Sequence, residues 1–471
     1  MTSAQPDSAT LSAPDAVPLG QAGGAGIVTP AGKIRVLVVT LIVVALAEAI
    51  GSVHFTLGPG KVVLQPMVWA LLLAAAWGVA QRRIPTVARI DAPLQGFAGA
   101  LLNAALMLFI AKLGLTVGGA LPMVRQAGWA LFFQEFGHAL GTLALGLPLA
   151  LLLGIKREAV GSTFSVGREG NLVIIGERFG MASPEGRGVL AEYITGTVLG
   201  ALFIAILAGF VASLHVFDPR SLAMGAGVGS GSMMAAALGA ITAQESPELV
   251  QQLTAIAAAS NLLTAVVGFY FTLFLSLPAC IWLYGKLEPV LGRVTARGRR
   301  AAEQAARAGS EMSAAETAAL AGATETPHTL SAADTVLAWV LMVGGVLIAN
   351  QMGYQVPMLI SLEGMLVIVA IAAVASLLKR VIPRVPLVLT LSIVATVVGI
   401  PGLFPFTDSV LALTGKLNFL AFTTPVLALA GFSVAKDLPL FRQLGWRIVV
   451  VSLTAAAGTF LGATLIAELF H

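Results

Sequence analysis

The stretch Gly114–Trp129 reads GLTVGGALPMVRQAGW, and a second version, GFSVAKDLPLFRQLGW, runs over Gly431–Trp446. The two windows align without a gap and agree at eight of their sixteen positions, whereas about one or two identities would arise by chance. The offset of 317 residues (431 − 114) also pairs Gly141–Thr142 with Gly458–Thr459. An internal repeat in a membrane protein bears on mechanism, because many secondary transporters consist of two halves related by symmetry. The shared residues are Gly114/Gly431, Val117/Val434, Leu121/Leu438, Pro122/Pro439, Arg125/Arg442, Gln126/Gln443, Gly128/Gly445 and Trp129/Trp446.

The composition is that of an integral membrane protein. Of the 471 residues, 57% are hydrophobic and 11% are charged, and the mean hydropathy is +0.92, whereas soluble domains carry about 25% charged residues. The net charge of +4 is expected when cytoplasmic loops hold the arginines, so nucleic acid is not an expected partner. The single cysteine, Cys280, excludes an intrachain disulfide and a cysteine-rich metal site. We expect neither a metal nor a cofactor.

Composition also divides the chain into four regions. Residues 1–33 are rich in Ala, Pro, Gly and Ser, which predicts a disordered cytoplasmic tail; a signal peptide would need an early basic region and an apolar core. Residues 34–285 form an N-terminal membrane half and residues 332–471 a C-terminal one. Between them, residues 286–331 are rich in Ala, Glu and Arg and are expected to be a cytoplasmic linker.

Eleven apolar runs are long enough to cross about 30 Å of hydrocarbon. The predicted fold is therefore all-α, a polytopic integral membrane protein. The fifth and sixth of these spans have no visible copy after the last one, so the sequence repeat covers only part of each half. The spans are placed at 34–53, 61–80, 94–113, 128–154, 188–214, 252–285, 334–350, 358–378, 385–400, 408–430 and 446–469.

Basic residues in short loops set the orientation, because such residues stay on the cytoplasmic side. Lys33 and Arg35 precede the first span, and arginine-rich loops follow the second, fourth, sixth, eighth and tenth. We expect a multi-pass protein of the inner membrane with a cytoplasmic N-terminus. All these loops lie inside only if residues 219–243 do not cross completely, which predicts a re-entrant or broken element there.

The same count fixes the relation between the repeats. It places Arg125 outside and Arg442 inside, so the two repeats are predicted to be antiparallel across the membrane. Such inverted repeats are the geometry that alternating access uses. Arg125 and Lys112 are exceptions to the charge bias.

The glycine-rich run GAGVGSGSMMAAALG at 225–239 allows two interpretations. Pairs of glycines four apart let helices pack closely. Alternatively, the helix is discontinuous and its free backbone groups face a ligand, because non-helical backbone at membrane depth is tolerated only against protein or a water-filled cavity. Four glycines in seven residues cost about 1 kcal/mol each within a helix, which favours the second interpretation. The candidate substrate-binding residues are Gly227, Gly229, Ser230, Gly231 and Ser232.

Ionisable residues inside predicted spans are functional candidates, because burying a charge there costs about 2.5–3.5 kcal/mol. Glu135 and His138 lie three residues apart and share a helix face. They are candidates for ion or proton coupling, or they merely pair with each other near the membrane surface. Thr423, Thr424 and Pro425 mark either a second helix break that contributes to the substrate site or a simple proline kink.

The connection 161–188 is long and contains further candidates. Ser183, followed by Pro184, is a typical helix start. Arg168 and Asn171 either bind an anionic substrate or belong to a surface turn. The apolar residues Leu172–Ile175 suggest that this connection enters the protein.

Three runs carry a resemblance: GREGNLVIIGERFGMASPEGRG at 167–188, GAGVGSGSMMAA at 225–236 and TPVLALAGFSVAKDLPLFRQLGWRIVVVSL at 424–453. They resemble the bacterial membrane proteins grouped as domain of unknown function 3100, over nearly everything from residue 34 onward. The resemblance implies a membrane location and makes Gly167–Asn171 and Gly225–Ala236 family motifs, but it implies no catalytic role. More distantly, antiparallel repeats around a broken glycine-rich segment are similar to the sodium:glutamate symporter and related elevator-type carriers, and such likeness does not fix function.

The function predicted from these features is secondary transport of a small solute, an organic anion by our interpretation, coupled to an ion or proton. The expected partners are the lipid bilayer and the small solute or ion; a homodimer is left open. The alternative is a non-transporting membrane protein, such as a holin-like or regulatory assembly. An enzyme is not expected, because the HExxH and GxSxG motifs are absent from the sequence.

Overall fold

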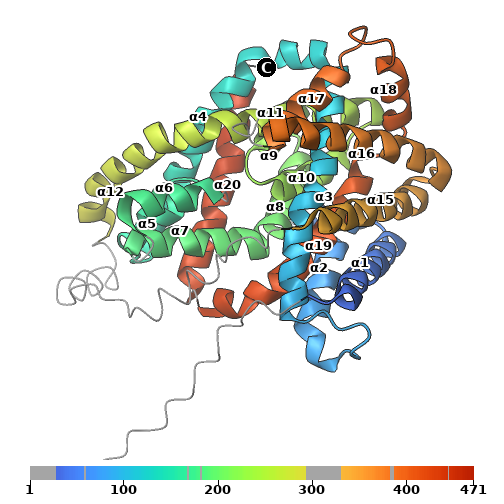
Figure 1. The fold of residues 1–471 in the computed structure, drawn as a ribbon. Helices are drawn as coiled ribbons and strands as arrows, with labels where there is room; N and C mark the ends of the chain where they lie inside the picture. Colours follow the sequence, from blue (N-terminus) through green and yellow to red (C-terminus); the bar gives the residue numbers. More distant parts are fainter. Residues whose placement is uncertain are drawn as a thin grey trace, which may run out of the picture.

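The computed structural model describes residues 28–57, 60–166, 169–180, 183–292, 330–381, 387–443 and 445–470. Nearly all of this part of the chain is helical (Figure 1). Most of the predicted tail and linker lies outside the described residues. Where their edges are described, helices extend further than predicted, to Pro30 at the start of the first helix and to Leu291 before the linker.

The N-terminal elements are α1 Pro30–Ile50, β1 Val53–Leu57, β2 Gly60–Leu64, α2 Pro66–Val79, η1 Ala80–Arg83, α3 Ala92–Gly119 and α4 Leu121–Leu152. The central elements are α5 Glu158–Thr163, α6 Glu169–Phe179, α7 Pro184–Thr195, η2 Gly196–Gly200, α8 Ala201–Ser213, α9 Pro219–Gly227, α10 Gly231–Thr242, α11 Pro247–Phe271, η3 Thr272–Ser276 and α12 Leu277–Leu291. The C-terminal elements are α15 Ala332–Tyr354, α16 Met358–Val381, α17 Leu387–Val398, α18 Thr407–Gly415, α19 Phe419–Gln443 and α20 Gly445–Glu468.

Seven helical segments of the described chain are long and apolar enough to cross a membrane. They confirm the polytopic helical membrane protein, while the count of eleven spans stays a prediction. Two predicted spans have a different structure: 61–80 begins in the hairpin strand β2, and 408–430 is divided between α18 and α19. The division follows from Asn418, whose side chain accepts from the Leu420 amide at 2.9 Å and so starts a new helix.

Local sequence determines other helix starts in the same way. Thr29, Asp91 and Ser183 each accept a hydrogen bond from an amide of the following first turn. A proline follows at the first or second helical position, where a missing N–H is tolerated. The predicted helix start at Ser183–Pro184 is confirmed, with Ser183 Oγ 2.9 Å from the Gly186 amide.

Helices α4 and α20 cross in direct backbone contact. A Cβ at Gly141 would overlap the carbonyl oxygen of Gly458, and a Cβ at Gly458 would overlap that of Gly141. Beside them the hydroxyls of Thr142 and Thr459 lie 2.7 Å apart. Both pairs join positions 317 residues apart, the offset of the sequence repeat. Because lower residue numbers of α4 meet higher ones of α20, the two helices run antiparallel.

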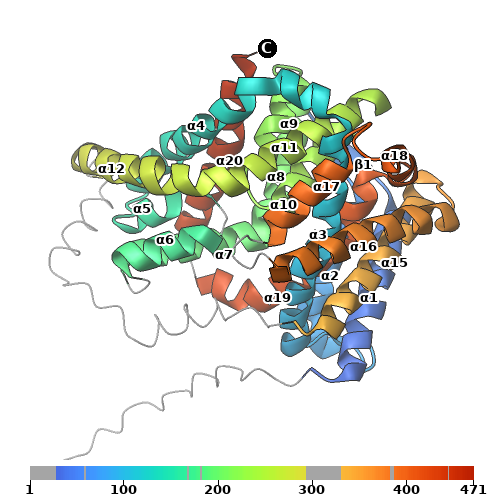
Figure 2. The same cartoon turned by 45° about the horizontal axis from the view of Figure 1, so that its top comes forward.

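Packing divides the helices into two groups (Figures 1 and 2). The flanking group, α1–α3 and α15–α19, lies at one end, and the broken-helix group, α4–α12 and α20, at the other. Helix α4 is kinked at Gly128, where φ is +45°, and α20 begins at Gly445, where φ is +66°; at these two points the chain passes from the flanking group into the body of the broken-helix group. These two glycines are partners in the sequence repeat, and among the described residues neither has a neighbour that a Cβ would touch. Both halves of the chain therefore contribute to both groups.

Cys280 is expected not to react with thiol reagents in the folded protein. The side chain is fully buried on α12, with Sγ 3.7 Å from the Val160 carbonyl oxygen and 3.7 Å from Thr163 Oγ1. Buried structural cysteines are inert because reagents cannot reach them. We expect maleimide labelling only after unfolding in SDS. Labelling of the folded protein at the rate of an exposed thiol would contradict this packing.

Candidate functional site

The glycine-rich run forms a broken helix, as the charge count and the run itself predicted. Helix α9 ends at Gly227, residues 228–230 are not helical, and α10 begins at Gly231. Gly229 has φ +115°, a conformation that other residues rarely adopt. Ser230, Gly231 and Ser232 are half-buried, whereas every other residue from 221 to 242 is buried. The break is thus the accessible point of an otherwise enclosed segment.

The glycines of this run have different functions. A Cβ at Gly225 would overlap the Thr464 side chain of α20, and one at Gly227 would overlap Ser260 of α11. These two glycines permit close helix packing, the first of the two interpretations. Gly231 would meet only an ordinary contact with Leu106. The run therefore combines close packing within α9 with an open turn before α10.

Helix α11 pairs the backbone groups that the break leaves free. The side-chain amide of Asn261 donates to the carbonyl oxygens of Gly227 at 2.7 Å and Gly229 at 3.2 Å. The hydroxyl of Ser260 donates to the Met224 carbonyl oxygen at 2.8 Å. The last carbonyls of a helix have no partner within it, and unpaired ones at membrane depth are costly. These bonds explain how α9 can end inside the bundle.

Two side chains of α4 reach the same face of α11. Gln134 Nε2 donates to Ser260 Oγ at 2.6 Å, and the Thr264 hydroxyl donates to Glu135 Oε1. Gln134 and Glu135 are fully buried. Residues predicted separately, the glycine-rich segment and Glu135, therefore meet through α11.

The hydrogen bonds continue from Glu135 along α4. His138 Nδ1 lies 3.4 Å from Glu135 Oε2, as their spacing on one helix face predicts. The carbonyl oxygen of His138 accepts from the Thr142 hydroxyl at 2.6 Å, and Thr142 meets Thr459. We call Gln134, Glu135, His138, Ser260, Asn261 and Thr264 the polar network; it runs from the α9–α10 break to the α4–α20 crossing.

The second predicted break, at Thr423–Pro425, is wrong. Helix α19 continues through these residues, and the interruption comes earlier, between α18 and α19. Thr423 donates to the Leu420 carbonyl oxygen, and Thr424 donates to Glu48 Oε1 on α1 at 2.7 Å. Their hydrogen bonds thus lie within the flanking group. They give no support to a substrate site between these residues and the glycine-rich segment. Glu48, which is buried, was missed because its partner is 376 residues away.

The other predicted anion-binding residues are only partly described. Arg168 lies outside the described residues, so its role stays a prediction. Asn171 is buried on the first turn of α6, and its Nδ2 has no partner among the described residues. Ile174 and Ile175 are buried, which confirms that this connection enters the protein.

A stripe of small and polar residues along α11, η3 and α12 was not recognised as a pattern in the sequence. The hydroxyl of Ser276 donates to the Phe164 carbonyl oxygen, and Thr272 donates to Ser165 Oγ at 3.4 Å, so the stripe also holds the segment between α5 and α6. A spacing of four residues drifts about 40° per step around an α-helix, and the wider π-helical turn η3 counters that drift. The sequence signal that could have revealed this stripe is the recurrence of small or polar residues at every fourth position. The stripe is Ser260, Thr264, Gly268, Thr272, Ser276 and Cys280.

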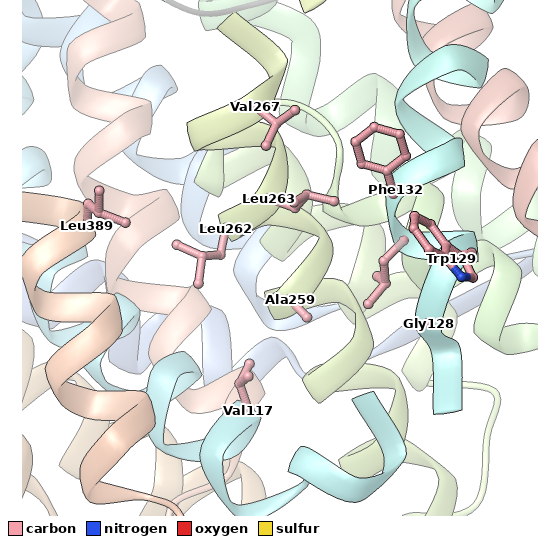
Figure 3. A pocket seen from close by; sticks show the side chains of 10 residues that line it. Val117, Gly128, Trp129, Phe132, Ala259, Leu262, Leu263, Val267 and Leu389 are labelled. Carbon is pink, nitrogen blue, oxygen red and sulfur yellow. The ribbon is translucent and has the colours of Figure 1, made fainter. Parts of the chain in front are cut away.

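A cavity of about 680 Å³ lies between α3, α4, α11 and α17 (Figure 3). Its described lining is apolar and includes Val117, Phe132, Leu263 and Leu389. Ligand sites of polar solutes need a few convergent polar groups. We therefore place the candidate site at the α9–α10 break and the polar network, on the neighbouring face of α4 and α11.

The fold and the site define a polytopic helical membrane protein with a broken helix held by a buried polar network. The chain belongs to the family described as protein of unknown function (DUF3100), whose profile matches residues 45–286, that is 242 (286 − 45 + 1) of the 471 residues. The resemblance stated for the first two motifs is confirmed; the third lies beyond the match. No curated protein and no solved structure matches the chain.

Proposed function

We propose that the protein is a secondary transporter that moves a small solute by alternating access, driven by an ion gradient. The observation that supports it best is the meeting of the α9–α10 break with Glu135 in one buried hydrogen-bond network. Transporters use discontinuous helices in this way, because their free ends supply groups for substrates and ions. A buried carboxylate inside a membrane bundle is costly and is a functional site by default.

The proposal includes inverted repeats related by the offset of 317 residues. Gly128, at a kink within α4, and Gly445, the first residue of α20, both have positive φ, and Gly141 and Gly458 meet at the antiparallel α4–α20 crossing. An approximate two-fold axis near the Thr142–Thr459 hydrogen bond would exchange the copies. The surroundings agree: Gly114 packs on α17, and Gly431 packs on α2, whose start precedes that of α17 by 321 residues (387 − 66), close to the offset of 317.

A second correspondence accounts for the spans without a copy. Helix α7 begins at Pro184 and α11 at Pro247, an offset of 63 residues (247 − 184), and Ser-Pro-Glu begins both. The same offset moves α6, Glu169–Phe179, onto α10, Gly231–Thr242, within one residue. In this proposal α5–α7 and α9–α11 are the remaining pair of copies. Each is the copy of the other, which is why none follows the last span.

Movement between the two helix groups would provide the alternating access. The groups are joined at Gly128 and Gly445, and no described residue lies within reach of a Cβ at either position. Hinges are a few residues that absorb changes of φ and ψ. The broken-helix group contains the whole polar network, so the site would move as a unit against α3 and α19.

The coupling step is proposed at Glu135. Thr264 has one hydroxyl proton and two acceptors in reach, Glu135 Oε1 and the Ser260 carbonyl oxygen at 3.0 Å. A charged Glu135 accepts a hydrogen bond from this hydroxyl. When Glu135 is neutralised by a proton or a bound cation, the Thr264 hydroxyl can donate to the Ser260 carbonyl oxygen instead. The charge of Glu135 would thus change the hydrogen bonding of α11, the helix whose Asn261 binds the α9–α10 break.

The substrate proposed for the break is a small organic anion. The start of α10 carries free amides and the positive end of the helix dipole, which favour an anion. Ser230 Oγ caps the Met233 amide at 3.3 Å and lies 3.2 Å from Ser232 Oγ. Both hydroxyls are half-buried and accessible. Gly227, Gly229 and Asn261 would shape the site.

Uptake is expected in proteoliposomes for at least one member of a panel of radiolabelled carboxylates and acidic amino acids. The panel is ordered by a thermal-shift screen, because specific ligands stabilise the native state. Glu135→Gln and His138→Ala should reduce gradient-driven uptake to that of protein-free liposomes, because the coupling charge is lost. Glu363→Gln, an exposed glutamate of α16, is the matched control and should transport normally.

A second readout separates transport from the non-transporting alternative. In Ser230→Cys the new thiol should react with maleimide, and the transported solute should slow that reaction. Cys280 adds no background if it is silent as expected. No saturable uptake and no protection by any panel member would favour a holin-like or regulatory assembly.

A further inference from the structure

The amide of Gln134 is held in one orientation by its neighbours. Its Nε2 lies 2.6 Å from Ser260 Oγ. The Ser260 hydroxyl donates its only proton to the Met224 carbonyl oxygen, so it can only accept from Gln134. The nitrogen of the amide therefore faces Ser260, and Oε1 points away from it.

Gln134 Oε1 is a buried acceptor with no partner among the described residues. Buried polar atoms without partners are rare and each requires a reason. The hydrogen-bond network to which Gln134 belongs holds further oxygens: the carboxylate of Glu135, the next residue, and the carbonyls of Met224 and Gly227 at the end of α9. Gln134 Oε1 therefore needs a hydrogen-bond donor or a cation as a partner, and the oxygens around the end of α9 supply neither.

The charge of this place favours a cation. Among the ion pairs of the described residues, Glu135 pairs only with His138, at 3.4 Å. The C-terminal end of α9 adds the negative end of a helix dipole. Groups of three or more His, Cys, Asp or Glu that could hold a metal ion are absent from the described chain; Ca²⁺ needs about six to eight oxygen ligands, and Mg²⁺ usually keeps several waters. One carboxylate with neutral oxygens suits a monovalent ion.

We propose that a sodium ion binds at the C-terminal end of α9, coordinated by Gln134 Oε1 and the carboxylate of Glu135. Free carbonyls and half-helix C-termini coordinate sodium in transporters built with broken helices. That sodium is the coupling ion rests on the proposed function; the binding site itself does not. Gln134 thereby acquires a role that its sequence context did not suggest.

Sodium binding can be measured without any substrate. We expect the melting temperature of the purified protein to rise saturably as sodium chloride replaces choline chloride at constant ionic strength, with a smaller effect of potassium chloride. Gln134→Leu keeps the side-chain volume and removes the oxygen, so the sodium needed for half of the effect should rise by about tenfold or more. Equilibrium binding of ²²Na⁺ to the wild-type protein gives the same constant directly.

Gln95→Leu is the matched control. Gln95 is also buried, and its Nε2 donates to the carbonyl oxygens of Gly78 and Ile90 in the flanking group. It should lower the melting temperature and leave the sodium dependence unchanged. Equal stabilisation by sodium and potassium, or a sodium effect that survives Gln134→Leu, would overturn the proposal. If Gln134→Leu fails to fold, absence of saturable ²²Na⁺ binding to the wild type decides against it. Either failure leaves proton-driven transport intact, which the uptake assay tests separately.

Discussion

Gly141→Val is expected to abolish accumulation of folded protein. The α4–α20 crossing leaves no room for a side chain, because a Cβ at Gly141 would overlap the carbonyl oxygen of Gly458. Overpacking of a core costs about 1–3 kcal/mol when side chains can adjust, and backbone atoms adjust less. The measurement is the yield of monodisperse protein by size-exclusion chromatography after extraction. Wild-type yield and melting temperature would show that these helices can separate without loss.

Alanine at the same crossing gives a sharper test. Gly141→Ala and Gly458→Ala should each lower the melting temperature, and the double variant should lose less than the sum of the two. The first substitution already forces the helices apart, and residues in contact are not additive. Gly415→Ala, whose Cβ would meet nothing within 4 Å, is the control and should be nearly silent. Strict additivity would contradict the mutual contact.

Asn261→Leu is expected to abolish uptake while leaving folded protein. It removes the donor that pairs the carbonyls of Gly227 and Gly229, and each unpaired buried carbonyl costs about 1–3 kcal/mol. The break should then lose its shape, which uptake and the rate of maleimide reaction at Ser230→Cys would both report.

Gln244→Leu separates this effect from simple destabilisation. Gln244 also donates to two carbonyl oxygens, those of Gly209 at 2.9 Å and Ala240 at 3.1 Å, away from the break. We expect it to lower the melting temperature to a similar extent and to retain uptake. Equal loss of uptake in both variants would mean that the bonds of Asn261 serve stability alone.

The broken helix could be predicted because two independent signals converged on it. The glycines of 225–239 made a continuous helix unfavourable. The basic loops all lie on the cytoplasmic side only if this segment does not cross the membrane completely. Local caps such as Ser183 were equally readable. Each of these features depends on residues close together in sequence or on a composition count.

The polar network could not be assembled from the sequence for the same reason. Gln134 and Ser260 are 126 residues apart, and Glu48 and Thr424 are 376 apart. Periodicity shows which face of a helix is polar but not which helix it meets. Lys112, an exception to the charge bias, illustrates the point: its Nζ is buried and donates to the Thr414 carbonyl oxygen at 2.7 Å, so it is no loop charge at all.

The sequence left two interpretations of Pro425 open, a helix break or a kink, because the effect of a proline depends on its surroundings. Proline frees a backbone carbonyl but does not by itself end a helix when neighbours fill the gap. Here Gly345 of α15 leaves room for the Pro425 ring, and the helix continues. The hairpin β1–β2 was missed because its strands have only five residues each, and an apolar strand that short resembles the start of a span.

If Gly128 is a hinge of the proposed movement, its position at the kink of α4 determines how far each part of that helix moves. The part of α4 from Gly128 to Leu152 has 25 residues and is about 37 Å long. A turn of about 10° at its first residue would carry the far end about 6 Å, roughly the length of a small carboxylate, with a displacement of only about 2 Å at Glu135. A small change of backbone torsion at Gly128 would thus produce a large displacement at Leu152, the other end of the same helix. Helix α20, which begins at Gly445 and runs antiparallel to α4, has 24 residues and would respond to a torsion at Gly445 in the same way.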